Sequence, residues 1–157
     1  LGFVQSVIDI IEETGIDPSD LTIEVTESVF TDNFELINLR LGRLQEMGIS
    51  VSIDDFGTGY SSLSRERELN VDYIKIDKYF IDKLEHIDPQ QAITADIISM
   101  AHKLGHMVVA EGVETEKQKS YIAENGCDLM QGFLFSRPVP SSSAIELLKG
   151  TNRAKQE

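Results

Sequence analysis

Ten consecutive residues read Ile53-Asp54-Asp55-Phe56-Gly57-Thr58-Gly59-Tyr60-Ser61-Ser62. Here an apolar segment ends at two adjacent carboxylates, and a glycine-rich loop follows at once. Val51 and Ile53 alternate with polar residues, which predicts a strand that ends at a charged site. Two neighbouring carboxylates repel each other unless a positive group lies between them. A divalent cation is the natural candidate for that group, because it prefers oxygen ligands.

On both sides of this stretch, segments with strand and helix patterns alternate. Apolar periodicity and glycine stops predict helices over 2–14, 33–47, 90–104, 115–125 and 141–149, and strands over 21–27, 50–54, 73–77 and 107–111, with a fifth strand inside 128–135. This order is typical of parallel strands joined by crossover helices.

The closed form of this plan is a (β/α)8 barrel of about 250 residues. The expected fold is therefore α/β and TIM-barrel-like, an incomplete (β/α)8 barrel with about five parallel strands that lacks the first strands. An open doubly wound sheet is the alternative at this length. Residues 1–150 are expected to form this part of a domain, and residues 151–157 a flexible tail.

The composition narrows the classes of partner. The chain has 27 acidic against 14 basic residues and a formal charge of −13. Without a basic patch, a nucleic-acid duplex is an unfavourable partner. An acidic protein that handles phosphates needs metal ions to offset the repulsion. Cys127 is the only cysteine, which favours a reducing compartment. We expect a cytoplasmic location, with any membrane anchor of the parent protein in an N-terminal region outside this sequence.

Polar or charged residues recur where the predicted strands end. In chain order they are Glu24, Asp54 with Asp55, Lys75, Glu111 and Gln131. A single polar residue of this kind is commonly just solvated at the end of a strand. A lone lysine in an apolar strand commonly prevents an edge strand from pairing with another chain. Parallel strands are largely buried, however, and their carboxyl ends meet at one rim. The recurrence therefore predicts a site in which acids hold metal and activate a water molecule.

These residues resemble the EAL-domain phosphodiesterases of bacterial signalling, which cleave cyclic di-GMP. The matching motifs stand in the family's order and at its spacing. They are Glu24-Val25-Thr26-Glu27-Ser28, Asp54-Asp55-Phe56-Gly57-Thr58-Gly59-Tyr60-Ser61-Ser62-Leu63, Ile74-Lys75-Ile76-Asp77, Glu111-Gly112-Val113-Glu114-Thr115 and Gln131-Gly132-Phe133-Leu134-Phe135-Ser136-Arg137-Pro138. The likeness extends to about Lys149.

The resemblance implies a site with two metal ions, Mg²⁺ or Mn²⁺. Glu24 and Asp54 are implied as metal ligands, with Asp54 bridging the two ions, and Asp55 and Glu111 as ligands of the second ion. Catalytic roles fall to Lys75, Glu111 and Asp55, with Lys75 orienting or deprotonating the attacking water.

The resemblance also assigns residues around that site. Gln131 is implied to contact substrate or water, and Glu27 to anchor the loop of residues 55–62. Glu114 is expected to cap the following helix or to lie behind the site.

The function implied for the parent domain is hydrolysis of cyclic di-GMP to linear pGpG. A homodimer and an upstream sensory or cyclase domain are the implied partners. The Glu-Ala-Leu motif that names the family has no counterpart here, and we expect the first strands to be missing. The isolated chain is therefore a candidate for an inactive fragment. The alternative is a receptor that binds cyclic di-GMP without cleaving it.

A phosphoacceptor receiver domain is a third possibility, because it also uses an acid pair and a lysine. There the pair lies on the first strand. The order found here, Glu24 before Asp54 and Asp55, then Lys75 and Glu111, fits that plan poorly.

Overall fold

In the part of the chain that the structure describes, five parallel strands form one sheet and lie side by side in the order of the sequence. The computed structural model describes residues 2–30, 33–56, 68–86, 88 and 91–153. The strands are β1 (Thr22–Thr26), β2 (Ser50–Phe56), β3 (Tyr73–Ile76), β4 (Met107–Ala110) and β5 (Leu129–Met130). A doubly wound sheet reverses its strand order at a switch point, whereas a barrel wall does not. The predicted barrel-like α/β winding is thus confirmed for the described strands.

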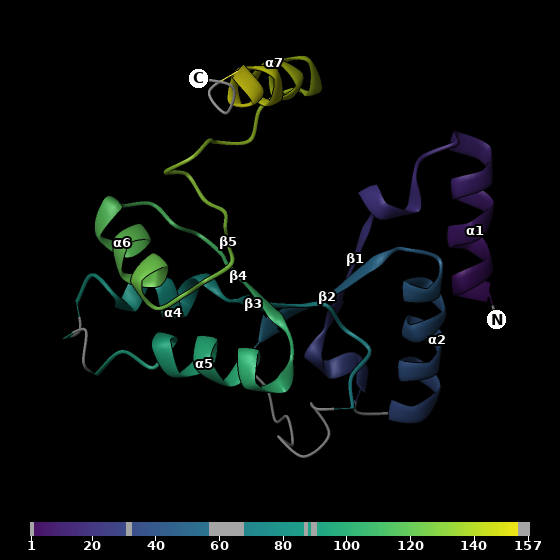
Figure 1. The fold of residues 1–157 in the computed structure, drawn as a ribbon, viewed down its shortest axis with the longest axis horizontal. Coiled ribbons are helices and arrows are strands. Elements are labelled where there is room, and N and C mark those ends of the chain that lie inside the picture. The colour runs from purple at the N-terminus through teal and green to yellow at the C-terminus, as the bar shows by residue number, and fades with distance from the viewer. Residues whose placement is uncertain (1, 31–32, 57–67, 87, 89–90, 154–157) are drawn as a thin grey trace.

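Helices connect the strands, as the periodicity predicts (Figure 1). They are α1 (Gly2–Thr14), α2 (Phe34–Glu46), α4 (Lys78–Lys83), α5 (Thr94–Leu104), α6 (Glu116–Glu124) and α7 (Ser141–Arg153). Two short 3-10 helices, η1 (Pro18–Asp20) and η2 (Glu27–Phe30), flank β1.

Several elements differ from the predictions. Helix α4 is new: it has six residues and begins directly after β3, with Asp77 as its N-cap. Strand β5 lies inside the predicted segment 128–135 but has only two residues, because the chain turns after Met130. Helix α7 continues to Arg153, three residues into the segment expected to be a tail.

One face of the sheet packs against helices and forms the core. Side chains such as Val51, Ile53, Ile74 and Val108 are at most 1% exposed on this face. Helices α1, α2, α5 and α6 lie on this side of the sheet (Figure 1). Burial of each such side chain contributes about 1.5–3 kcal/mol. The apolar half of each alternating strand therefore fixes which side the helices cover.

The strand residues between these apolar ones point to the opposite face of the sheet. Thr26 pairs with Asp54, and Ile53 pairs with Ile74, so Asp54 and Lys75 share this second face. A bulge between Ile53 and Phe56 adds a residue to β2 directly after this point. The polar residues predicted from the strand ends thus lie on the face that the described helices do not cover.

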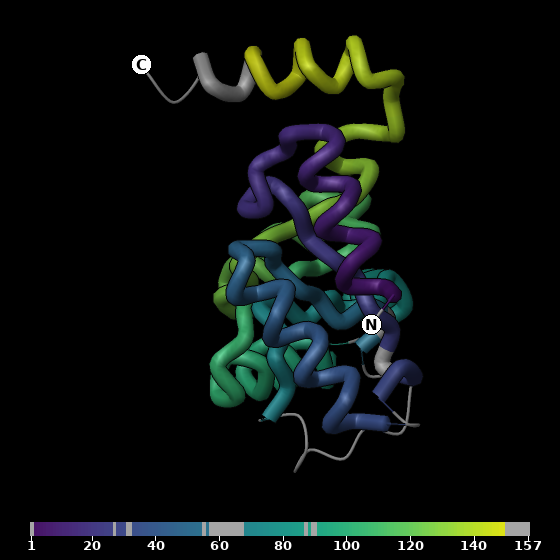
Figure 2. Tube along the Cα trace, turned by 90° about the vertical axis from the view of Figure 1, so that its right-hand side faces the viewer, coloured from purple at the N-terminus to yellow at the C-terminus, as the bar shows by residue number. Residues whose placement is uncertain are grey.

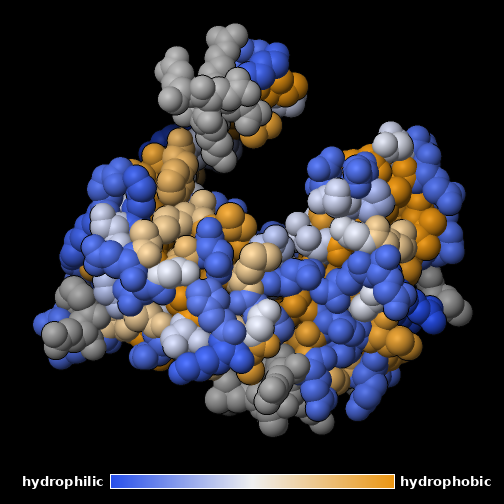
Figure 3. Space-filling view, in the orientation of Figure 1, coloured by the Kyte–Doolittle hydropathy of each residue, from blue (hydrophilic) through white to orange (hydrophobic). Residues whose placement is uncertain are grey.

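Helix α7 stands apart from the sheet, at the end of the segment that follows β5 (Figures 1 and 2). Its apolar residues Ile145 and Leu148 are exposed, as are Phe3 and Ile10 of α1. Figure 3 shows apolar surface over both helices. None of the helices in the described part of the chain has the length and apolarity that a membrane span requires.

Candidate active site

Three carboxylates from three strands surround one ammonium group. Nζ of Lys75 lies 2.8 Å from Oε1 of Glu111, 2.9 Å from Oε1 of Glu24 and 3.0 Å from Oδ1 of Asp54. The Lys75 side chain is only 8% exposed. An ammonium has three N–H donors, so these contacts use its whole donor capacity. We call Lys75 with these three carboxylates the lysine cluster.

The lysine cluster follows from strand geometry. Lys75 is the third of four residues in β3, and its neighbours Ile74 and Ile76 point into the core. Because successive side chains of a strand point to opposite faces, the Lys75 side chain points to the face away from the core. Glu111 directly follows β4, and its amide donates to Ile76 O at 3.1 Å, which ties it to the end of β3. The carboxyl ends of parallel strands meet at one rim, and this rim carries active sites in barrels.

Gln131 joins the lysine cluster from the last strand. Its Nε2 donates to Oε1 of Glu111, the same oxygen that contacts Lys75. Its backbone amide donates to Ala110 O at 2.9 Å, so the ends of β4 and β5 are adjacent. The Glu111 carboxylate thus has two side-chain partners, and it is 17% exposed compared with 51% for Glu24.

Two opposing effects act on the pKa of Lys75. Burial lowers it, but hydrogen bonds with Glu111, Glu24 and Asp54 raise it more, and the pKa lies above the usual value for lysine. In this arrangement the group is an ammonium that donates hydrogen bonds. The lysine cluster carries three negative charges and one positive charge.

The structure brings together five of the predicted site residues: Glu24, Asp54, Lys75, Glu111 and Gln131. The side chains of Asp55 and Glu27 lie outside the described part of the structure, as does most of the loop over 55–62 that Glu27 is predicted to anchor. Their assigned roles stay predictions.

The donor chemistry fits a divalent cation. Carboxylate oxygens are the ligands that Mg²⁺ and Mn²⁺ prefer, and the excess negative charge of the lysine cluster favours a cation. Within the described residues, however, no group of three or more His, Cys, Asp or Glu side chains has metal-binding geometry by itself. Lys75 Nζ lies between the carboxylates that would have to converge on an ion.

Two roles were expected for Glu114, a cap of the following helix or a place behind the site, and the structure excludes the first. Helix α6 is capped by Thr115, which forms a capping box with Gln118, and not by Glu114. Glu114 instead forms an ion pair with Lys78, with Nζ and Oε1 2.6 Å apart. The Thr-x-x-Gln spacing is a capping-box signature that could have identified the cap.

Comparisons with known proteins identify the family that the chain matches. Residues 1–138 match the model of the family described as EAL domain. The chain is 44% identical over 146 residues to the cyclic di-GMP phosphodiesterase NbdA of Pseudomonas aeruginosa, covering 93% of this chain and 19% of that protein. The chain thus spans about a fifth of the length of this relative.

Solved structures agree with the sequence match. A structure described as PaMucR phosphodiesterase in complex with c-di-GMP superposes with a TM-score of 0.84 at 40% identity, covering 91% of this chain and 58% of that one. BlrP1 of Klebsiella pneumoniae, in a complex with manganese and cyclic di-GMP, superposes with a TM-score of 0.74 at 38% identity, covering 86% of this chain and 34% of that one.

Proposed function

The chain belongs to the EAL domain family, and from this premise we propose that it carries the catalytic rim of a phosphodiesterase that hydrolyses cyclic di-GMP to linear pGpG. The observation that carries this proposal is the convergence of Glu24, Asp54 and Glu111 on Lys75 at the carboxyl ends of the strands. Two relatives, 44% and 40% identical to the chain, are described as a cyclic di-GMP phosphodiesterase and as a bifunctional diguanylate cyclase/cyclic di-GMP phosphodiesterase.

The reaction adds the oxygen of a water molecule to phosphorus and breaks the P–O3′ bond, and the 3′ oxygen leaves with a proton. Glu24, Asp54, Asp55 and Glu111 are the residues that would hold Mg²⁺ or Mn²⁺, which polarises the phosphodiester and acidifies bound water.

Individual side chains have separate tasks in this proposal. When the carboxylates hold metal, Lys75 would turn its N–H donors to the attacking water and offset the negative charge that develops on the phosphate oxygens. Glu111, the least exposed of the three carboxylates, accepts a hydrogen bond from that water. Gln131 contacts substrate or water beside Glu111, and Glu27 anchors the loop of residues 55–62.

One observation favours a second candidate function, which is a receptor that binds cyclic di-GMP without cleaving it. Among the described side chains, the acids do not form a metal site without further ligands. A chain that cannot complete the site could still bind the dinucleotide along the rim. Metal-dependent turnover distinguishes the two functions.

The test compares the 157-residue chain with a version extended at its N-terminus to the length of the solved EAL domains. Cyclic di-GMP is incubated with each protein and Mg²⁺, Mn²⁺ or EDTA, and pGpG is separated by chromatography. We expect metal-dependent pGpG formation by the extended protein. Binding of cyclic di-GMP without cleavage at saturating Mn²⁺ would establish the receptor function instead, and absence of binding would reject both.

We also propose that the protein forms a homodimer and acts beside sensory or cyclase domains. Support for the dimer comes from β1 and β5, which are the outermost strands of the described sheet, because exposed strand edges promote pairing. Sedimentation of the 157-residue chain at several concentrations, with and without cyclic di-GMP, tests the dimer. A monomer under all of these conditions would contradict it.

A further inference from the structure

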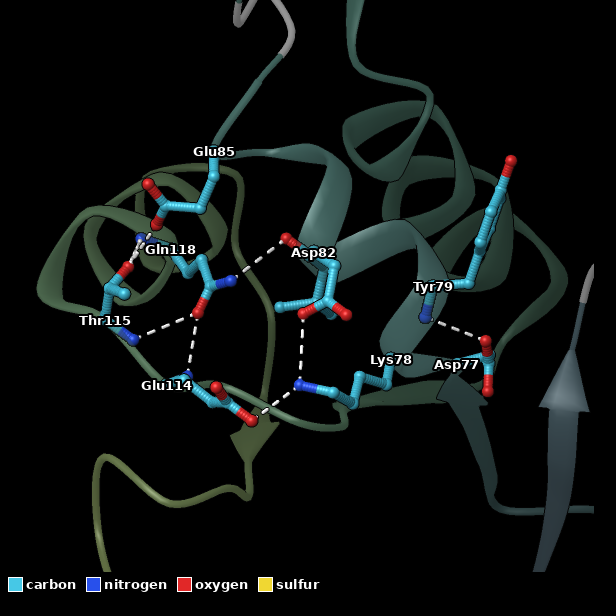
Figure 4. A network of polar contacts seen from close by, with 9 residues as sticks. Asp77, Lys78, Tyr79, Asp82, Glu85, Glu114, Thr115 and Gln118 are labelled. Atoms are coloured by element: carbon cyan, nitrogen blue, oxygen red, sulfur yellow. Dashed lines mark hydrogen bonds and ion pairs between the residues drawn. The ribbon is translucent and has the colours of Figure 1, made fainter.

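Lys78, at the start of α4, forms ion pairs with Glu114 and with Asp82 (Figure 4). Its Nζ lies 2.6 Å from Oε1 of Glu114 and 3.1 Å from Oδ1 of Asp82. Asp82 belongs to α4 itself, whereas Glu114 lies three residues after Glu111. The ion pair therefore fastens the end of β4 to the helix that follows β3.

The aliphatic part of Lys78 packs on the backbone next to Glu111. A Cβ atom at Gly112 would lie 2.5 Å from Cγ of Lys78 and 2.8 Å from its Cβ and Cδ. Gly112 also has a φ of +69°, which side-chain-bearing residues rarely adopt. A glycine at this position thus allows the lysine stem to lie against the residue that directly follows Glu111.

The same segment is held from its other side by the end of β5. The Val113 amide donates to Gln131 O at 3.0 Å, and the Leu134 amide donates to Val113 O at 3.0 Å. A Cβ at Gly132 would lie 2.2 Å from the Val113 backbone. Glu111 is thus followed by a short segment enclosed between α4 and β5.

Beyond Glu114, buried Gln118 attaches the chain to α4 a second time. Its Oε1 accepts hydrogen bonds from the amides of Glu114 at 2.7 Å and Thr115 at 3.0 Å, and its Nε2 donates to Ile81 O at 3.3 Å. Figure 4 shows this network between α4 and the start of α6. Among the residues of this network, Lys78 lies nearest in sequence to β3, the strand that carries Lys75.

We propose that Lys78 is a positioning residue that sets the place of the Glu111 carboxylate in the lysine cluster, through its stem on Gly112 and its ion pair with Glu114. The proposal rests on the proposed function only for its catalytic consequence. In the described structure, the charged partners of Lys78 are Asp82 and Glu114, and no cluster residue is among them, so Lys78 acts through the backbone.

The charge of Lys78 is stable at neutral pH. Hydrogen bonds to Glu114 and Asp82 raise the pKa of Lys78 above its usual value. Its side chain is about half exposed, and half-exposed ion pairs add little to overall stability. Loss of the ammonium should therefore affect the site more than the fold, which separates positioning from a structural role.

The test uses Lys78→Met in the extended protein, because methionine keeps most of the stem and removes the charge. The matched control is Lys119→Met, which removes the exposed Lys119–Glu116 ion pair of 3.1 Å on α6. We expect Lys78→Met to lower kcat about tenfold with little change in KM, and Lys119→Met to change kcat less than about twofold. Exchange of the pair, Lys78→Glu with Glu114→Lys, should recover part of the loss.

Crystal structures of the same variants give a readout that does not depend on turnover. We expect the Glu111 carboxylate to move away from Lys75 in Lys78→Met and to stay in place in Lys119→Met. If the wild type does not cleave cyclic di-GMP, the proposed function fails, and this displacement alone tests the positioning role. An unmoved Glu111 in Lys78→Met, or a wild-type kcat in an active protein, would overturn the inference.

Discussion

The two ends of the sheet both carry carboxylates, but these carboxylates have different partners. At the N-terminal end, Asp72 and Asp128 each stand directly before a strand. Oδ2 of Asp72 accepts from the Val51 amide at 2.8 Å, and Oδ2 of Asp128 accepts from the Val108 amide at 2.7 Å. In both cases an aspartate satisfies an amide near the start of the neighbouring strand, so the arrangement occurs twice along the sheet.

At the C-terminal end, the carboxylates surround a side chain. Glu24, Asp54 and Glu111 each lie within 3.0 Å of Lys75 Nζ. Every strand start offers a backbone amide, whereas a nearly buried ammonium among acids depends on particular side chains. In barrel enzymes the N-terminal end contributes stability and the C-terminal end contributes chemistry. The partner of a carboxylate, rather than its position at a strand end, therefore indicates its role here.

Removal of the central ammonium should have the largest effect on function. In the extended protein we expect Lys75→Met to lower cyclic di-GMP turnover about a thousandfold, because the water loses its orienting group and the carboxylates lose their cation. Turnover is measured with Mn²⁺ and substrate saturating, and circular dichroism confirms folding. Lys149→Met, which removes an exposed pair on α7, is the control. Normal turnover of Lys75→Met would show that contact with Lys75 does not indicate a catalytic role for the carboxylates at the C-terminal end.

A second substitution tests whether stability also depends on the C-terminal end. A Cβ at Gly132 would lie 2.2 Å from backbone atoms of Val113, which cannot rotate away. We expect Gly132→Ala to lower the free energy of unfolding by about 3 kcal/mol. Gly15→Ala is the control, since Gly15 has a φ of +68° but open space around it, and should cost only about 1 kcal/mol. Equal losses in denaturant titrations would contradict the close-approach argument.

Substitutions at the N-terminal end should show the opposite of Lys75→Met, a loss of stability without a loss of turnover. Asp128→Asn keeps the shape of the side chain but weakens its hydrogen bond to the Val108 amide, so we expect a loss of about 1 kcal/mol in the free energy of unfolding. Turnover of the extended protein at saturating substrate should stay unchanged. Asp72→Asn should behave in the same way. A large loss of turnover without a loss of stability in these variants would show that the carboxylates of the N-terminal end also have a catalytic role.

Much of this contrast is visible in the sequence, but not all of it. Alternating apolar residues predicted the strands, and the rule that parallel strands end at one rim brought Glu24, Asp54, Lys75 and Glu111 together. Those predictions rest on local periodicity and one topological rule. Helix α4 was missed because its six residues are too short for a periodic signal.

The roles of Asp72 and Asp128 need more than periodicity. Each lies across from an amide of a strand about twenty residues earlier in the chain, so its partner depends on strand register. The Lys78–Glu114 pair depends in the same way on how the start of α4 lies against the segment that follows β4. A shared signal did exist, since Asp72 and Asp128 both stand directly before a strand, but this position alone does not name the partner.

The smallest predicted effect concerns the pH dependence of the N-terminal end. Burial raises the pKa of Asp128, but hydrogen bonds from His102 and the Val108 amide lower it more, so the folded-state pKa lies below the usual value. A carboxylate with a lowered pKa stabilises the fold above its unfolded pKa of about 4, and this contribution is lost as the pH falls through the folded value. Because Asp128 is partly exposed, solvent screening keeps the contribution below about 1 kcal/mol.

Between pH 6 and pH 3, roughly the range where carboxylates titrate, Asp128→Asn should therefore lose less stability than the wild type, and His102→Gln should lie between them. Urea titrations at several pH values measure this, and identical pH profiles for all three proteins would mean that the Asp128 carboxylate contributes nothing to the fold through its charge.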